Sequence, residues 1–369
     1  MIRVMNTNLI IGKTGSFKTT GILFKEVDEV IDEGNSLIIL DKKEEYYKTF
    51  KEKLDKRGYK SLVLNLKDAY KSDSFNPLWL PYKLHKEGNK DRAAELIRDL
   101  GTEIFRDDNK NSDPFWSNAS INYFVSLVLI LFKEAKEDEI NLYSVQVLLS
   151  MTTKDKGKDV KNYFDNLDPL DTIYMAGSGT VYAPSETKSS IISVINQRLN
   201  VFCIKEQLLN NLAFNDIDLS NLDEKSAIFI ICDDLSQRLG NVLIDQVASL
   251  DKKFTYVLDN FDGVLLSSLN DLLDRRERVY VAIRNEKEFT ESYGNYMEDK
   301  FENIVDDFSV QEKMKVGNYN DYPKASFRKV NYFDAAKFFS KEHEKNKGDA
   351  NFIDFVNKEI KSLNDFDVK

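Results

Sequence analysis

The sequence predicts an α/β fold in which a mostly parallel sheet carries an inserted all-helical region. Short apolar, β-prone runs alternate with helix-length segments in residues 1–83 and again in residues 181–335. In residues 84–180 apolar residues recur at helical spacing, and no strand pattern is evident. The chain of 369 residues is long enough for two domains and a further small element, a charged helical C-terminal tail over residues 336–369.

The first region predicts three strands joined by helices. Apolar, β-prone residues occupy 9–11 and 37–40, and the stretch KSLVLNL gives a third strand. Gly34 and Gly58 end the intervening helices, because glycine readily adopts the left-handed conformation that closes a helix. Strands joined through helices run parallel, so this region starts a mostly parallel sheet.

The later elements follow the same two patterns. Residues 121–132 are the most apolar run, but a membrane span needs about 20 residues, so we expect a buried helix, with an interfacial helix as the alternative. Residues 226–233, 254–262 and 279–285 read as short apolar strands separated by helix-length segments. The stretch FRKVNYFD is a candidate for one more strand.

The composition limits the classes of function. A net charge of −10 argues against a surface coated for duplex DNA, but it leaves a local basic channel open. Cys203, Cys232, His85 and His343 are the only cysteines and histidines, and their spacing matches no metal site. We expect both cysteines to be buried thiols in a reducing cytosol, and no signal peptide precedes the first strand.

The stretch IIGKTGSFKTT, residues 10–20, nearly matches the phosphate-binding loop (P-loop) G-x-x-x-x-G-K-[ST]. In such a loop, backbone N–H groups at a helix N-terminus cradle phosphate oxygens, a lysine reaches the β- and γ-phosphates, and a hydroxyl holds Mg²⁺. Lys18 and Thr19 are the candidates for the last two roles. The candidate nucleotide ligands in the loop are Gly12, Thr14, Gly15, Ser16, Phe17, Lys18, Thr19 and Thr20.

Phe17 stands where the P-loop has its second glycine. A bulky residue is poorly suited to a positive φ or to the close approach of a phosphate. Strain of about 1–3 kcal/mol would lower nucleotide affinity by roughly one to two decades without abolishing binding. The alternative is a Gly-Lys-Thr turn that binds no ligand.

Two further strand ends carry candidate site residues. Asp259 ends the apolar strand of TYVLDNFDG, which is the Walker B arrangement, in which the aspartate supports Mg²⁺. Hydrolytic versions continue with glutamate, whereas Asn260 can orient a water molecule but cannot take its proton. Arg284 ends the strand of VYVAIRN at the same sheet edge, where a guanidinium could replace a cation or bind phosphate. The alternatives are an aspartate that caps a turn and a surface arginine. The candidate catalytic residues are Lys18, Asp259 and Asn260, and the candidate metal ligands are Thr19 and Asp259.

Several stretches stand in a characteristic order. NTNLIIGKTGSFKTTG is followed by SLIILDKKEEYYKTF, VLNL, SFNPL, DPFWSNASINYFVSLVLILFKEA, YAPSETKSSIISVINQRLNVF, FIICDD, YVLDNFD and SYG. Over about residues 6–335 this order resembles the type IV secretion coupling proteins, the ATPases of conjugative DNA transfer. Asp41, Lys43 and Glu45 take the places of the Asp, Lys and Glu in the family's Asp-Pro-Lys-Gly-Glu motif.

The resemblance implies a RecA-like motor domain with an inserted all-helical domain that recognises the substrate. It also implies a homo-oligomer, a hexameric ring with nucleotide sites between subunits and arginines supplied in trans, and ATP with Mg²⁺ as ligands. The implied partners are a relaxase–DNA complex and secretion channel proteins, and contact with single-stranded DNA is left open.

The resemblance also bears on where the protein acts. The family's membrane helices precede the first strand and none stands here, so we expect a soluble fragment or form, or an anchor in another chain. The expected location is the cytoplasm, at the inner face of the membrane through partners.

Three departures from the family fall at one expected site. Phe17 lies in Walker A, Asn260 follows Walker B, and Arg284 stands where the family has a glutamine. One remodelled nucleotide pocket explains them better than independent drift, so we expect a coupling-protein-like factor with weak or absent ATP binding and little hydrolysis. Whether the chain is an enzyme stays open. The alternatives are a non-catalytic adaptor or structural paralogue in a mixed ring, with Arg284 in the phosphate site, and an active ATP-driven DNA translocase in which Glu45 positions water.

Overall fold

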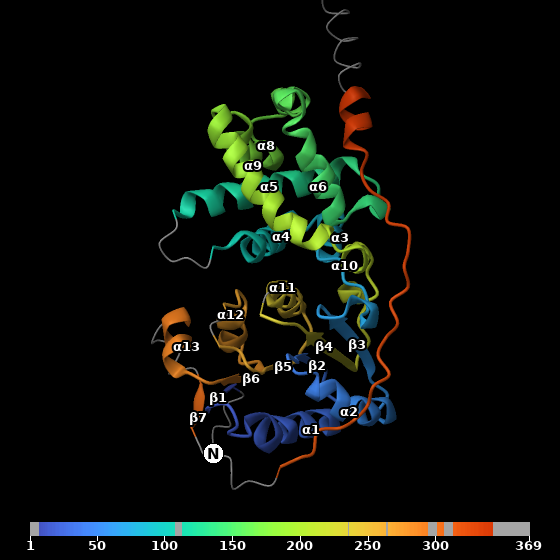
Figure 1. Cartoon of the computed structure of the whole chain (residues 1–369), viewed down its shortest axis with the longest axis vertical. Coiled ribbons are helices and arrows are strands. Elements are labelled where there is room, and N and C mark those ends of the chain that lie inside the picture. The colour runs from blue at the N-terminus through green and yellow to red at the C-terminus, as the bar shows by residue number, and fades with distance from the viewer. Residues whose placement is uncertain are drawn as a thin grey trace, which may run out of the picture. The chain divides into compact units, whose positions relative to one another are not determined.

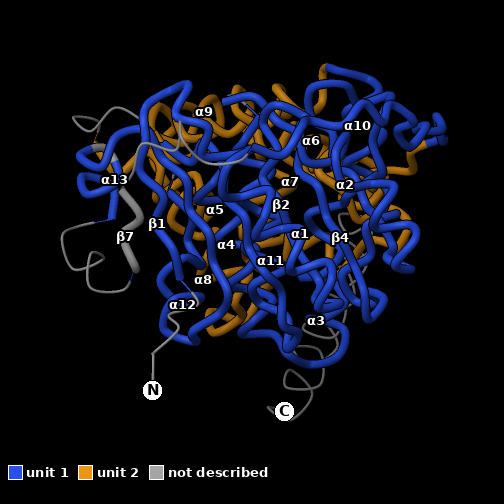
Figure 2. The backbone as a smooth tube through the Cα atoms, turned by 90° about the horizontal axis from the view of Figure 1, so that it is seen from below, with its two compact units in different colours: residues 1–104, 205–329 blue, residues 105–204, 330–369 orange. Residues whose placement is uncertain are grey.

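The computed structural model describes residues 7–107, 113–234, 236–262, 265–293, 301–305 and 313–341. The chain divides into two compact units. Unit 1 comprises residues 1–104 and 205–329, and unit 2 comprises residues 105–204 and 330–369 (Figure 2). Each unit is therefore assembled from segments that lie far apart in the sequence.

Unit 1 is built on a seven-stranded sheet in the order β3-β4-β2-β5-β6-β1-β7 (Figure 1). All pairings between neighbouring strands are parallel, which confirms the predicted α/β class. Most strands read as unbroken apolar runs because a parallel sheet is covered on both faces. The strands are β1 (Thr7–Ile11), β2 (Leu37–Leu40), β3 (Lys60–Asn65), β4 (Ser226–Ile231), β5 (Thr255–Leu258), β6 (Arg278–Ile283) and β7 (Glu302–Val305).

Helices cover both faces of this sheet (Figure 1). On one face, α1 (Phe24–Glu33) and α2 (Glu45–Lys56) bury an apolar cluster against the strands. On the other face, α11 (Gln237–Ala248) packs so closely that a Cβ added to Gly240 would lie 2.7 Å from Cγ2 of Ile230. The remaining α-helices of unit 1 are α3 (Trp79–Lys86), α4 (Lys90–Phe105), α10 (Glu206–Ala213), α12 (Leu269–Asp274) and α13 (Glu286–Tyr293).

Unit 2 is helical in its described residues. Asp113 begins α5 (Pro114–Glu134) by accepting a hydrogen bond from the amide of Phe115, and a proline occupies the first turn, where its missing N–H is not needed. Residues 123–132 of α5 are all buried, so this helix forms the core of the unit. The other helices are α6 (Leu142–Met151), α7 (Lys158–Asp165), α8 (Thr172–Val181), α9 (Ser185–Cys203) and residues 335–341.

By length and composition, α5 could cross a membrane. However, 67% of its most apolar window is buried inside the protein, as in the core helix of a folded domain. The helix is longer than the apolar run at 121–132 that predicted it, because residues 114–120 extend it at its start by almost two turns.

The boundaries of the two units differ from the domain boundaries predicted at residues 83/84 and 180/181. The domain prediction stays a prediction. Helix α4 begins inside the predicted helical region but belongs to unit 1. Arg238 and Asn241 of α11 both donate hydrogen bonds to Glu103 of α4, at 3.4 and 3.2 Å. Helical periodicity thus identifies α4 as a helix, but it does not say which core the helix joins.

Residues 313–329 form a segment of unit 1 that we call the strap. It runs along the unit without regular secondary structure, and the chain then enters unit 2 at residue 330 (Figure 1). The strand expected from FRKVNYFD is wrong, because these residues have no ladder partner among the described strands. The amides of Arg328 and Phe333 donate instead to the side chains of Asn210 and Ser144. Residues 335–341 are helical, and the rest of the predicted tail lies outside the described residues.

Candidate nucleotide-binding site

The stretch after β1 has the layout of a P-loop. Residues 12–17 form a loop between β1 and the wide π-helical turn η1 (Lys18–Leu23), which continues into α1. The amide of Gly12 donates to the carbonyl of Ile283 at 3.1 Å, which fixes the loop to β6. Among the described residues, the amides of Thr14, Gly15 and Phe17 have no acceptor. Unbonded amides at a helix N-terminus are the donors that an anion such as phosphate requires.

Two polar side chains lie inside this loop. Lys18 is buried, and its ammonium donates to the carbonyl oxygens of Gly12 and Lys13. Burial lowers the pKa of Lys18, and the negative charges of Asp259 and Asp262 oppose this shift. The hydroxyl of Ser16 is buried without a hydrogen-bond partner. The Lys18 ammonium and the Ser16 hydroxyl are thus polar side-chain groups inside the loop that could donate to a phosphate.

Phe17 adopts a left-handed backbone conformation, which glycine takes up most readily. Its φ is 63° and its ψ is 22°, in the left-handed region, and its side chain is 43% exposed. This conformation costs a non-glycine residue about 1–2 kcal/mol. Phe17 therefore holds a conformation that glycine adopts without this cost, with its aromatic ring partly exposed.

Walker A and Walker B residues meet at the carboxyl edge of the sheet. The hydroxyl of Thr19 donates to Oδ2 of Asp259 at 2.7 Å, and the hydroxyl of Tyr46 donates to the same oxygen at 3.1 Å. Burial raises the pKa of Asp259, and these hydrogen bonds oppose the rise. A hydroxyl and a carboxylate are the oxygen ligands that Mg²⁺ prefers.

The described residues hold no cluster of three or more Asp, Glu, His or Cys side chains that could bind a metal by itself. Mg²⁺ at Thr19 and Asp259 would therefore need phosphate oxygens and water to complete its shell. This is how Mg²⁺ commonly binds with a nucleotide, through one or two protein groups. The donor set thus fits a magnesium–nucleotide complex better than a free metal ion.

The stretch after β2 supplies one structural carboxylate and two charges near the site. Asp41 accepts hydrogen bonds from the amides of Glu45, Tyr46 and Tyr47 at 2.9, 3.1 and 3.0 Å, so it caps α2, and burial raises its pKa to about 7. Lys43 lies close enough to oppose the rise in the pKa of Asp259. The negative charge of Asp259 in turn helps burial to raise the pKa of Glu45.

A sequence model of the type IV secretory system family for conjugative DNA transfer matches residues 4–254. The chain belongs to the type IV coupling protein family. No curated protein sequence matches it.

Solved structures of the coupling protein TrwB share the fold of this family member. The unbound monoclinic form of TrwBdeltaN70 matches with a TM-score of 0.55 and 14% identity, over 80% of this chain and 66% of that chain. The complex of TrwB with ADP and Mg²⁺ matches with a TM-score of 0.56 and 15% identity, over 80% and 67%. The complex with the ATP analogue ADPNP matches with a TM-score of 0.55 and 13% identity, over 80% and 68%. The chain thus spans about two thirds of the length of these structures.

In this coupling protein family member, the Arg284 side chain is bound to Asp262 and does not point freely into the proposed phosphate site. Its backbone amide and Nε donate to the two carboxylate oxygens of Asp262 at 2.5 and 2.9 Å. Asp262 is almost fully buried, whereas the Arg284 side chain is 56% exposed. The positive charge of Arg284 contributes to lowering the pKa of Lys18, so the arginine lies near the loop but is held by Asp262.

Sequence reasoning missed two residues of this site. Asp262 lies in the quoted LDNFDG stretch, and a second acidic residue after Walker B was the available signal. The role of Tyr46 had no local signal, because its partner Asp259 is 213 positions away. In the SYG stretch, the hydroxyl of Tyr293 accepts a hydrogen bond from the amide of Leu266 at 2.8 Å, and Gly294 lies outside the described residues.

Proposed function

We propose that this chain binds ATP with Mg²⁺ weakly and hydrolyses it slowly or not at all while serving conjugative DNA transfer. The observation that carries the proposal is the 2.7 Å hydrogen bond between Thr19 and Asp259. It brings the two proposed magnesium ligands together beside a loop in which, among the described residues, the amides of Thr14, Gly15 and Phe17 have no acceptor. The complexes of TrwB with ADP and Mg²⁺ and with ADPNP support this assignment by analogy.

The proposed roles follow from the chemistry of each group. The amides of the loop and the ammonium of Lys18 would hold the phosphates, and Thr19 and Asp259 would hold Mg²⁺, which would screen the phosphate charge. Asn260 adopts a φ of 54° directly after Asp259. Its amide can orient a water molecule but cannot accept the proton, so hydrolysis would be slow.

The remaining proposals rest on the family. The chain would assemble into a hexameric ring at the cytoplasmic face of the membrane, with arginines in trans. It would link a relaxase–DNA complex to the secretion channel, with the helical region as the substrate-recognition element. Single-stranded DNA remains a candidate ligand of the ring.

Two alternatives receive different support. The adaptor alternative, in which Arg284 fills the phosphate site, is weakened because Asp262 holds that guanidinium. The active translocase alternative, in which Glu45 positions water, is favoured by one observation, since burial, helped by the charge of Asp259, raises the pKa of Glu45. A carboxylate with a raised pKa near a metal site is a reasonable acceptor for a proton.

Titration calorimetry of the full chain with ATP and Mg²⁺ tests the proposal, alongside a steady-state assay of phosphate release. We expect a dissociation constant weaker than micromolar, turnover near background, and loss of binding in Lys18→Ala. Lys56→Ala, an exposed lysine on α2, is the matched control and should bind as the wild type does. Fast hydrolysis that Lys18→Ala abolishes would favour the translocase alternative. Binding that Lys18→Ala leaves unchanged would refute the assignment of the loop.

A further inference from the structure

The strap contacts the P-loop at its anomalous residue. The ammonium of Lys313 lies 3.3 Å from the centre of the Phe17 ring, in the position of a cation–π interaction. The amide of Met314 donates to the carbonyl of Thr20 at 3.0 Å. Lys18 and Thr19, the two proposed phosphate and magnesium ligands, therefore lie between two points of contact with the strap.

These contacts lie where the backbone is least favourable. Phe17 has a φ of 63°, which is disfavoured for every residue with a Cβ and most for a bulky one. Such a conformation persists only where the surroundings hold it in place. The amide of Gly21 holds the Phe17 carbonyl at 2.7 Å, and Lys313 is the cation that the structure places on the exposed ring of Phe17, so Lys313 is the side-chain contact that can add support to the turn.

The strap is itself held firmly over α2. The amide of Gly317 donates to Oγ1 of Thr49 at 3.0 Å, and that of Tyr319 donates to the carbonyl of Lys48 at 3.2 Å. A Cβ on Gly317 would lie only 2.2 Å from the Lys48 carbonyl oxygen, so only glycine allows this approach. The Tyr322 ring stacks on the Tyr47 ring at 4.6 Å.

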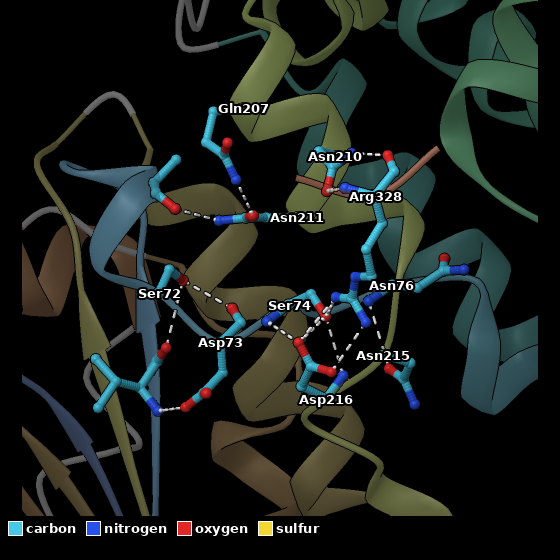
Figure 3. A network of polar contacts seen from close by, with 12 residues as sticks. Ser72, Asp73, Ser74, Asn76, Gln207, Asn210, Asn211, Asn215, Asp216 and Arg328 are labelled. Atoms are coloured by element: carbon cyan, nitrogen blue, oxygen red, sulfur yellow. Dashed lines mark hydrogen bonds and ion pairs between the residues drawn. The ribbon is translucent and has the colours of Figure 1, made fainter. Parts of the chain in front are cut away.

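The far end of the strap is fixed by Arg328, as Figure 3 shows. Its guanidinium donates to both carboxylate oxygens of Asp216 at 3.1 and 2.9 Å and to the hydroxyl of Ser74 at 2.7 Å. Its backbone exchanges hydrogen bonds with the side chain of Asn210. Because the strap is fixed at both ends and in its middle, Lys313 is presented to Phe17 at a defined place.

We propose that Lys313 is a positioning residue of the nucleotide loop. Acting through Phe17, it holds the left-handed turn from which Lys18 and Thr19 project, and so replaces the conformational freedom that glycine gives to an ordinary P-loop. The nucleotide affinity of this chain therefore depends on the docking of its own strap. This inference rests on the proposed function, since it assumes that the loop binds nucleotide.

The test is a double-mutant cycle on the full chain with ATP and Mg²⁺, read by calorimetry. Lys313→Ala should weaken binding by roughly threefold, the size expected for an exposed cation–π contact. Lys313→Arg should restore it, because a guanidinium also stacks on an aromatic ring. In a Phe17→Gly background, Lys313→Ala should have no effect, because glycine needs no support. Lys315→Ala, an exposed lysine of the same strap, is the matched control.

A second measurement separates failure of this inference from failure of the proposed function. Without nucleotide, Lys313→Ala should speed hydrogen–deuterium exchange in residues 12–20 at least threefold, while Phe17→Gly and the double variant should exchange alike. If no variant binds ATP but the exchange follows this pattern, the proposed function fails and Lys313 still positions the loop. The inference is overturned if Lys313→Ala changes the exchange rate of residues 12–20 equally whether position 17 is Phe or Gly. It is also overturned if Lys313→Ala changes the rate in neither background.

Discussion

The hydroxyl of Tyr46 donates a hydrogen bond to the buried carboxylate of Asp259 at 3.1 Å. The two residues are 213 positions apart, and the bond joins the first turn of α2 to the end of β5. A buried carboxylate without donors would stay protonated and would be a poor ligand for Mg²⁺. The tyrosine therefore helps to keep the proposed metal ligand ionised.

Removing this hydroxyl should weaken magnesium-dependent binding. In Tyr46→Phe, Asp259 loses one donor and its pKa rises further, so affinity for ATP with Mg²⁺ should fall roughly tenfold, as for a hydrogen bond to a charged group. Binding of ATP without Mg²⁺ should not change, and the defect should shrink as pH rises. Calorimetry with and without Mg²⁺ measures both. Tyr59→Phe is the control, because that hydroxyl donates to the carbonyl of Asn35 instead.

Restoring a base beside Walker B should raise hydrolysis. In Asn260→Glu the new carboxylate can accept the proton of an attacking water, and general-base catalysis contributes roughly 10²–10⁴-fold. We expect phosphate release to rise at least tenfold in a steady-state assay. Asn260→Gln has the same length without the charge and should stay at background. An unchanged rate in Asn260→Glu would favour Glu45 as the residue that positions water.

Asp245 of α11 should make stability depend on pH. Burial raises its pKa from an ordinary value of 3.8 to about 8, and its Oδ2 has no hydrogen-bond partner. The folded state therefore holds a proton that the unfolded state releases, so stability should be greatest below pH 4 for this group and fall as pH rises to about 8. Asp245→Asn should flatten this fall and should be more stable than the wild type above pH 8. Urea midpoints between pH 5 and pH 9 test this, with exposed Asp271→Asn as the control.

The strap should detach when Gly317 gains a side chain. In Gly317→Ala the new Cβ would lie 2.2 Å from the Lys48 carbonyl oxygen and 2.7 Å from Cα of Thr49, so the strap must shift. We expect faster proteolysis within residues 313–329 with little loss from the sheet, because the strap contributes no strand and, among the described residues, only Tyr322 to the buried core cluster. Gly179→Ala in α8 meets open space and should be neutral. Equal protease resistance of the two variants would contradict the docking described here.

The elements that the sequence predicted best are those that bury one continuous apolar run. The strands predicted at 37–40 and 226–233 are Leu37–Leu40 and Ser226–Ile231 in the structure. A short apolar run bounded by turn residues forms a buried strand most readily, because a parallel sheet is covered on both faces. The strap gave no such signal, since backbone hydrogen bonds and single aromatic contacts hold it. It was read in part as a strand, which its lack of ladder partners excludes.

In the candidate site, too, local sequence patterns predicted single residues but not the contacts between distant segments. Motif spacing singled out Lys18, Thr19 and Asp259, and the structure brings their side chains to one sheet edge. Arg284 was placed at the correct edge, but its bond to Asp262 depends on how two loops meet, which no local pattern encodes. No sequence pattern predicted the role of Lys313, because its partner Phe17 lies near the other end of the chain.

The strand order has a consequence for synthesis. None of the first three strands pairs with another of them, because β1 lies between β6 and β7, β2 between β4 and β5, and β3 beside β4. Residues 7–65 therefore leave the ribosome with all their ladder partners still untranslated, and their edges stay exposed until residue 226 and beyond follow. The sheet can close only after most of the chain has been made. A nascent chain halted before β4 is accordingly expected to aggregate or to remain bound to chaperones.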